Sequence, residues 1–346
     1  MADLRPKTAP TVTLTGDARE ATDDRPARRV DDRVGVAPGE QVGLPTGHRL
    51  ADRYVIRRPI GVGGFGTVYE AEDTRLTKPV AVKVLNRSAA TRHQIGRFHR
   101  EAIAASQIGH PGIINVTDFG QDDDTNFMVM ELLEGAELSE LCERRGTLPP
   151  LEALEIVRDI AEAVGAAHRE QILHRDLKPS NVFVTGSRRL KVIDFGIAKI
   201  LADHLEVDGM TFEGQVMGTA EYMAPEQARG DADLDARVDV YALGVILFEL
   251  VTGERPFSAD SVAALMEAHR LAPTPLASER APELAGAAAI DGLCARALAK
   301  DRDERFEGMQ AFVRAIDEAR ASLRQGERRD GHAGRRRVTP ARVALL

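Results

Sequence analysis

Two polar clusters in the middle of the chain limit its fold more than any other feature. The first reads HRDLKPSN at 174–181 and the second reads DFG at 194–196, and the stretches NVFVTG and LKVIDFG beside them predict short strands. They place a carboxylate, a lysine, an amide and a second carboxylate within residues 176–194. Each aspartate alone could be a turn residue. Together the groups suit phosphoryl transfer, which needs a base, cations and oxygen ligands for Mg²⁺.

A glycine-rich turn, GVGGFGTVY at 61–69, precedes these clusters between two predicted strands. Gly61, Gly63 and Gly66 would let the backbone approach phosphate groups closely. Glycine-rich hairpins are common, so the turn by itself leaves its role open. It is not the nucleotide loop that ends in Gly-Lys-Ser/Thr, because a strand follows. A dinucleotide fold is disfavoured because its glycine fingerprint opens a helix.

Lys83 lies in the apolar stretch VAVKV, which predicts a strand. Because side chains alternate along a strand, Lys83 shares its face with Ala81 and points away from Val82 and Val84. A nucleotide could place its base on Ala81 and its phosphates at Lys83. A partly buried lysine needs an anion, and Glu101 in FHREA is the candidate. The alternatives are a surface lysine of an edge strand and a solvated helix carboxylate.

The pattern along the chain predicts an α+β fold with a small β-rich lobe followed by a larger helical lobe. Strand patterns dominate from Tyr54, interrupted by one helix near 93–108, and helical patterns dominate after Gly135. One helix carries an apolar stripe of Leu154, Val157, Ile160, Ala161 and Val164, and later helices are predicted near 237–252, 260–270, 287–299 and 308–322. We expect one domain over 47–320, after a disordered arm at 1–46 and before an Arg-rich, disordered tail at 321–346.

Composition excludes several other classes. The net charge of −8 argues against nucleic-acid binding, which needs a broad basic face. The sequence contains neither an apolar run long enough to span a membrane nor a signal peptide. Cys142 and Cys294 are the only cysteines, which fits a reducing cytoplasm.

The chain resembles the eukaryotic-like (Hanks-type) protein kinases from about Tyr54 to about Phe306, and the motifs HRDLKPSN and YMAPEQARG resemble bacterial members. The resemblance implies a bilobal protein-kinase fold, with an N-lobe at about 54–133 that holds one helix and a C-lobe at about 134–320. It implies ATP as substrate and Mg²⁺ as cofactor. It also implies that Glu226 pairs with Arg305 and that Asp239 braces the catalytic loop.

The resemblance assigns a role to each matching position. Glycines would cover the phosphates, apolar residues would hold adenine, Met130 would be the gatekeeper, and a lysine–glutamate pair would hold the α- and β-phosphates. These nucleotide residues are Gly61, Gly63, Gly66, Val68, Ala81, Lys83, Glu101, Met130, Glu131, Leu133 and Phe183. Asp176 would accept the substrate proton, Lys178 would neutralise the γ-phosphoryl group, and Mg²⁺ would bind Asn181 and Asp194.

The same resemblance favours serine and threonine as acceptors. Lys178 and Thr219 would narrow the entrance beside Asp176 for a short aliphatic hydroxyl. Thr211 is the only residue with a hydroxyl group between Gly196 and Gly218, and we hypothesise that it is autophosphorylated. An ordinary loop threonine is the alternative.

These observations predict a cytoplasmic serine/threonine protein kinase of bacterial signalling, with protein substrates and autophosphorylation in a transient homodimer. A scaffold without catalysis is one rival, but such proteins usually lack the lysine, aspartate or asparagine retained here. A small-molecule kinase is the other rival, and those lack the GTAEYMAPE segment on which a peptide would lie.

Overall fold

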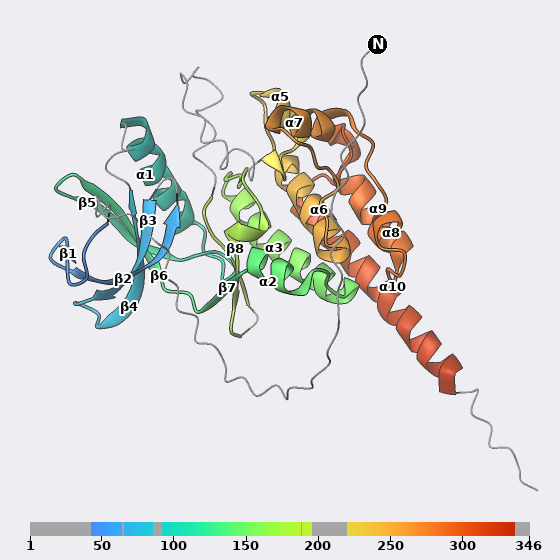
Figure 1. Ribbon diagram of the computed structural model, residues 1–346, viewed down its shortest axis with the longest axis horizontal. Coiled ribbons are helices and arrows are strands. Elements are labelled where there is room, and N and C mark those ends of the chain that lie inside the picture. Colours follow the sequence, from blue (N-terminus) through green and yellow to red (C-terminus); the bar gives the residue numbers. More distant parts are fainter. Residues whose placement is uncertain (1–42, 64–65, 86–91, 188, 196–219, 336–346) are drawn as a thin grey trace, which may run out of the picture. The chain divides into compact units, whose positions relative to one another are not determined.

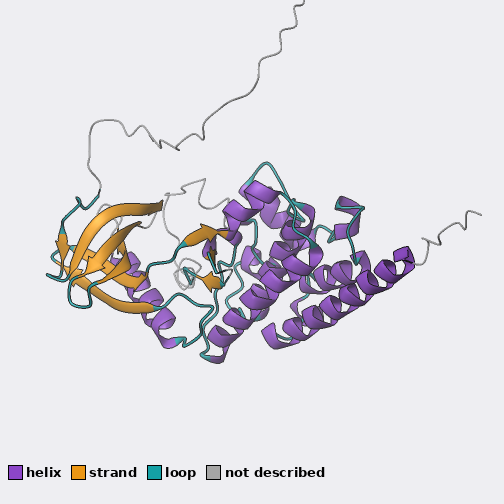
Figure 2. Ribbon diagram, turned by 90° about the horizontal axis from the view of Figure 1, so that it is seen from below, coloured by secondary structure: helices purple, strands orange, loops and turns teal. Residues whose placement is uncertain are grey.

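The computed structural model describes residues 43–63, 66–85, 92–187, 189–195 and 220–335. Strands gather in the first part of these residues and helices in the second, as Figures 1 and 2 show. The predicted α+β class, with a β-rich region followed by a helical one, is therefore confirmed.

A six-stranded antiparallel sheet forms the first part, in the order β1-β2-β3-β4-β6-β5. Its strands are β1 Arg49–Leu50, β2 Tyr54–Gly63, β3 Gly66–Asp73, β4 Lys78–Leu85, β5 Val116–Asp122 and β6 Thr125–Glu131. In β4, Val82 and Val84 pack into a cluster with Tyr54 and Ile56. Lys83 therefore points to the other face, as its alternation with the valines predicts.

Helix α1, Arg92–Gln107, packs beside β5 and covers that other face of the sheet (Figure 1). Its buried residues Phe98, Ala102 and Ala105 form a cluster with Met128 of β6 and Val116 of β5. Their spacing of three and four residues puts them on one side of the helix. The helix is thus held by apolar packing close to the strand that carries Lys83.

A second sheet of three strands, in the order β7-β8-β9, lies beyond β6 in the chain. Its strands are β7 Gly135–Glu137, β8 Val182–Thr185 and β9 Leu190–Val192, so both predicted short strands are present. A parallel bridge joins Ile113 to Val192. The two polar clusters of the sequence flank this sheet, with HRDLKPSN before β8 and Asp194 after β9.

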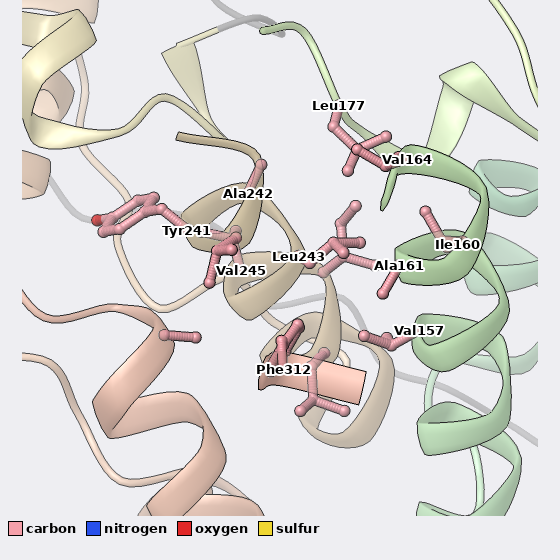
Figure 3. Close-up of a cluster of buried hydrophobic side chains, with 14 of the residues drawn as sticks. Val157, Ile160, Ala161, Val164, Leu177, Tyr241, Ala242, Leu243, Val245 and Phe312 are labelled. Atoms are coloured by element: carbon pink, nitrogen blue, oxygen red, sulfur yellow. The ribbon is translucent and has the colours of Figure 1, made fainter. Parts of the chain in front are cut away.

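Buried helices α3 and α6 form the centre of the second part. Figure 3 shows Ile160, Ala161 and Val164 of α3 facing Leu243 of α6, with Phe312 close by. Every member of the predicted α3 stripe is buried, so that prediction is confirmed. The helices are α2 Leu138–Arg145, α3 Pro150–Arg169, α5 Pro225–Arg229, α6 Arg237–Thr252, α7 Val262–Leu271, α8 Ala277–Arg280, α9 Ala287–Ala297 and α10 Met309–Arg335, with 3-10 turns at Pro179–Asn181 and Arg302–Glu304.

Helix α10 differs from the prediction, because it continues to Arg335, past residue 320 where the disordered tail was expected to begin. Leu323 is buried and packs beside Gly286, so apolar packing extends beyond the expected end. The residues that follow combine good helix formers such as arginine and glutamate with three glycines, Gly326, Gly331 and Gly334, which disfavour a helix. Among the described residues, no helix combines the length and the apolar character needed to cross a membrane.

Candidate active site

A cavity of about 140 Å³ lies between the large sheet and the second sheet. Most of its lining is apolar, and three charged residues, Lys83, Glu131 and Asp194, complete it. Of the residues predicted to hold a nucleotide base, Val68, Ala81, Met130, Glu131, Leu133 and Phe183 all line this cavity. A flat apolar group with a charged extension would therefore match its walls.

Lys83 and Asp194 form an ion pair at one edge of the cavity. The distance from Lys83 Nζ to Asp194 Oδ1 is 2.7 Å, and their side chains are 14% and 48% exposed. Asp194 has a φ of 52°, in the left-handed region that non-glycine residues rarely adopt. Such conformations cluster at functional sites. The predicted partner of Lys83, Glu101, lies in α1, but its side chain falls outside the described residues.

The loop 174–181 brings together the two predicted catalytic residues, Asp176 and Lys178, and the predicted Mg²⁺ ligand Asn181. Lys178 Nζ lies 3.3 Å from Asp176 Oδ2. Asn181 Nδ2 donates a hydrogen bond to the carbonyl oxygen of Asp176 at 2.7 Å and lies 3.4 Å from its Oδ2 atom. A cation and an amide thus both lie within 3.4 Å of the Asp176 carboxylate.

Asp239, a carboxylate in the first turn of α6, holds the loop 174–181 in place through hydrogen bonds to its backbone. It is buried and accepts backbone N–H bonds from His174 and Arg175, both at 2.8 Å. His168 Nε2 lies 2.7 Å from the same carboxylate. Burial alone would raise the pKa of Asp239, but the contact with His168 and these N–H donors lower it below its ordinary value. The expected brace is therefore present.

The segment 220–230 is anchored to the same loop and to the helices. Gln227 Nε2 donates to the carbonyl oxygen of Arg175 at 2.9 Å. Beneath it, Arg305 binds both carboxylate oxygens of Glu226, at 2.7 and 2.8 Å. Their side chains are 0% and 1% exposed, so the expected Glu226–Arg305 pair is a buried ion pair.

The three glycines of the turn have different environments. At Gly66 an added Cβ would come within 2.3 Å of the Val84 carbonyl oxygen, so the approach of β3 to β4 itself requires glycine there. At Gly61 and Gly63 the nearest atoms to such a Cβ are 3.9 and 3.6 Å away. Those are ordinary van der Waals distances, so contacts within the sheet require glycine at Gly66 but not at Gly61 or Gly63.

One polar network beside the cavity was missed by the sequence interpretation. Lys191 of β9 donates to Glu131 Oε1 at 2.6 Å, and the same oxygen accepts the N–H of Asn115 at 2.8 Å. Glu131 in turn donates its own N–H to the Asn115 carbonyl oxygen at 3.0 Å. The only sequence signal for this network was the position of Lys191 between the apolar residues Leu190 and Val192 in a strand. That position predicts which face Lys191 points to, but not which residue it contacts.

Two predicted regulatory residues, Thr211 and Thr219, lie outside the described residues. Their assigned roles stay predictions.

Comparison with known protein families gives one match that covers most of the chain. The family model described as "Protein kinase domain" matches residues 54–314. Among solved structures, the kinase domain of PknI from Mycobacterium tuberculosis superimposes with a TM-score of 0.62 at 31% identity, covering 80% of this chain and 99% of that one.

Three similar curated proteins come from bacteria. Serine/threonine-protein kinase PrkC of Bacillus subtilis is 39% identical over 284 residues, which is 82% of this chain and 43% of that protein. Serine/threonine-protein kinase pkn3 of Myxococcus xanthus is 38% identical over 296 residues, 83% of this chain and 54% of that protein. PknB of Mycobacterium leprae is 40% identical over 270 residues, which is 76% of this chain and 42% of that protein. The chain therefore spans about half the length of these relatives.

Proposed function

The chain belongs to the protein kinase family, and from that premise we propose that it transfers the γ-phosphoryl group of ATP to serine and threonine hydroxyls of proteins. The observation that carries this proposal is the convergence of Asp176, Lys178 and Asn181 in one loop, next to a cavity with Lys83 and Asp194 at its edge. The relatives named serine/threonine-protein kinases support the acceptor class.

Adenine would occupy the apolar cavity. Ala81 and Val68 would lie on one side of the ring and Phe183 on the other, since all three line the cavity. The N–H of Glu131 is donated to Asn115, so its carbonyl oxygen would be the group offered to the adenine edge, with the backbone of Leu133 beside it. The phosphates would then extend under the end of β2 toward Lys83.

In the transfer step, Asp176 would accept the proton of the attacking hydroxyl while its geometry is fixed by Asn181. Lys178, 3.3 Å from Asp176, would offset negative charge that develops on the transferred group. The backbone N–H bonds to Asp239 hold this loop without using any of its catalytic side chains. Catalysis would thus rest on positioning and electrostatics.

Asn181 and Asp194 are the groups we propose for Mg²⁺. The amide nitrogen of Asn181 already donates to the Asp176 carbonyl oxygen, which directs Oδ1 to a cation. An amide oxygen and a carboxylate suit Mg²⁺, which in nucleotide sites takes few protein ligands and fills the rest with phosphates and water. When bound, the ion neutralises charge on the phosphate oxygens.

We further propose a cytoplasmic site of action on protein substrates, with transient pairing of two copies during autophosphorylation at Thr211. A scaffold without catalysis is the second candidate function. A measurement of phosphoryl transfer distinguishes it from a kinase.

The test is transfer of label from γ-labelled ATP with Mg²⁺ to a generic basic protein, by the wild type and by Asp176→Asn. A positioned proton acceptor contributes about 10²–10⁴ in rate, so the variant should lose that much while still binding ATP. Asp159→Asn, at a half-buried carboxylate of α3, is the matched control and should retain full activity. A wild type that binds ATP but transfers no label would favour the scaffold.

A further inference from the structure

A half-buried glutamine, Gln227, bonds two separate parts of the proposed active site. It is the third residue of α5. Its Nε2 atom donates to the carbonyl oxygen of Arg175 at 2.9 Å, and its Oε1 atom accepts the N–H of Ala224 at 3.1 Å. Arg175 directly precedes Asp176, and Ala224 ends the segment 220–224, on which a peptide would lie. One side-chain amide therefore joins the catalytic loop to that segment.

Helix capping accounts for only one of these two bonds. A glutamine or a glutamate at the third position of a helix can reach back to the N–H of the residue before the helix, as Gln227 does with Ala224. Of these two side chains only glutamine also carries N–H groups, and one of them is the donor to Arg175. The bond to the catalytic loop is therefore additional to the cap, and it depends on the amide.

The backbone of Arg175 is held at both of its polar groups. Its φ of 64° lies in the left-handed region that non-glycine residues rarely adopt, and such conformations persist only where neighbouring groups enforce them. Its N–H donates to Asp239 Oδ1 at 2.8 Å, and its carbonyl oxygen accepts the bond from Gln227. The peptide plane between Arg175 and Asp176 contains this carbonyl group, so a bond to it also orients the backbone from which the Asp176 side chain projects.

We propose that Gln227 is a positioning residue for phosphoryl transfer, which fixes the catalytic loop and the segment 220–224 to each other through the Arg175 carbonyl oxygen and the Ala224 N–H. The inference rests on the proposed function, because it concerns the acceptor hydroxyl that reaches Asp176. Geometry of this kind has a large effect on rate, since a misplacement of about 1 Å can cost about 10²-fold.

The variant Gln227→Glu of the full chain separates the two bonds. The carboxylate still accepts the Ala224 N–H, but it has no hydrogen to donate to the Arg175 carbonyl oxygen. With γ-labelled ATP and a threonine peptide, we expect kcat at pH 8 to fall by about tenfold or more. The KM for ATP should change by less than about twofold, because Gln227 does not line the cavity. Gln310→Glu, at an exposed position of α10, makes the same chemical change and should keep the wild-type kcat.

The pH profile of Gln227→Glu tests the lost donor directly. A protonated carboxyl group can donate to the Arg175 carbonyl oxygen as the amide does, and burial beside that oxygen raises the pKa of the new carboxyl group above the ordinary value of about 4.3. The ratio of its kcat to the wild-type kcat should therefore rise as the pH falls from about 8 toward about 5.5. Using a ratio removes the titration of groups common to both proteins, such as Asp176, Asp239 and His168.

A second variant and a second measurement complete the test. Gln227→Met loses both bonds and cannot titrate, so its kcat ratio should be low and should not change with pH. Hydrogen exchange needs no activity: the amides of residues 174–176 should exchange faster in both Gln227 variants than in the wild type, because the catalytic loop loses an anchor. If Gln227→Glu does not fold, Gln227→Met carries the same expectations for kcat and for exchange.

Any one of three results would overturn the inference. These are a kcat of Gln227→Glu within about twofold of the wild type at pH 8, a kcat ratio that stays flat as the pH falls, and unchanged exchange at residues 174–176. A wild type that binds ATP and transfers no label would instead contradict the proposed function. The exchange comparison then decides alone, because faster exchange supports the link between loop and segment and equal exchange refutes it.

Discussion

Two ion pairs in this molecule, Glu226–Arg305 and Lys83–Asp194, have the same contact distance and opposite surroundings. Both have a closest contact of 2.7 Å. The side chains of the first pair are 0% and 1% exposed, and those of the second are 14% and 48% exposed. Arg305 binds both oxygens of Glu226 and also donates to the Ala299 carbonyl oxygen. The hydrogen-bonding groups of this buried pair are therefore satisfied by other groups of the same chain.

The second pair is only partly exposed, and both of its members line the cavity. Asp194 lines the cavity and, with a side chain 48% exposed, can offer oxygen atoms to an incoming group. Lys83 faces the same cavity. A buried pair that loses one member leaves a charge without a partner, whereas an exposed pair is solvated by water. We therefore expect stability to depend on the first pair and activity on the second.

The largest effect on stability is expected from Glu226→Gln. It leaves the buried Arg305 without its counter-charge, which should lower the free energy of unfolding by about 3–5 kcal/mol. Urea unfolding followed by circular dichroism measures the change. The exposed pair Arg158–Glu162 provides the control, because Glu162→Gln should cost less than about 1 kcal/mol. A loss at Glu226 no greater than at Glu162 would contradict the comparison.

An intermediate effect is expected from pH, through the buried His269. Burial first, and then Lys300, lower its pKa to about 4, while the Tyr241 hydroxyl lies 2.9 Å from Nδ1. The unfolded chain therefore takes up the proton first, near the ordinary value of about 6.5. Stability should be full above that value and fall as the pH drops toward 4, by about 2 kcal/mol between pH 7 and pH 5.

This prediction is checked by urea unfolding at several pH values for the wild type and for His269→Gln, which keeps a polar group for Tyr241. The variant should show a shallower loss between pH 7 and pH 5. Equal slopes in the two proteins would assign the acid sensitivity to other groups.

The smallest effect on stability is expected from Lys83→Met. Because its partner Asp194 is half exposed, the free energy of unfolding should change by less than about 1 kcal/mol. Label transfer from ATP should nevertheless fall by about 10²–10³, the usual cost of removing one donor from a site that stabilises charge. A destabilisation as large as that of Glu226→Gln would mean that the two pairs do not differ as described.

Sequence reasoning predicted the elements whose information is local. The α3 stripe, the alternation around Lys83 and the strands beside HRDLKPSN each follow from spacing within a few residues. The cavity residues followed from the family resemblance, since residues such as Ala81 and Phe183 meet only after folding.

Contacts between distant residues were not predictable. Lys191 meets Glu131 across 60 positions, and nothing near either residue specifies the other. Arg255 and Glu221 come together because the turn after α6 packs against the segment 220–224, which depends on tertiary packing and not on local pattern. The end of α10 was misplaced for the same reason, since burial of Leu323 is a tertiary effect.

The Glu226–Arg305 pair also limits the mutational routes open to this chain. The two residues are 79 positions apart in the sequence. Replacing both of them requires at least two separate nucleotide changes. Well-packed apolar residues at both sites can be as stable as a buried pair, but either single replacement strands a charge in the interior. Selection or laboratory evolution that accepts one substitution at a time must pass through a strongly destabilised intermediate to reach that alternative. The pair is thus retained because each single substitution is destabilising, and not only because the pair itself is stable.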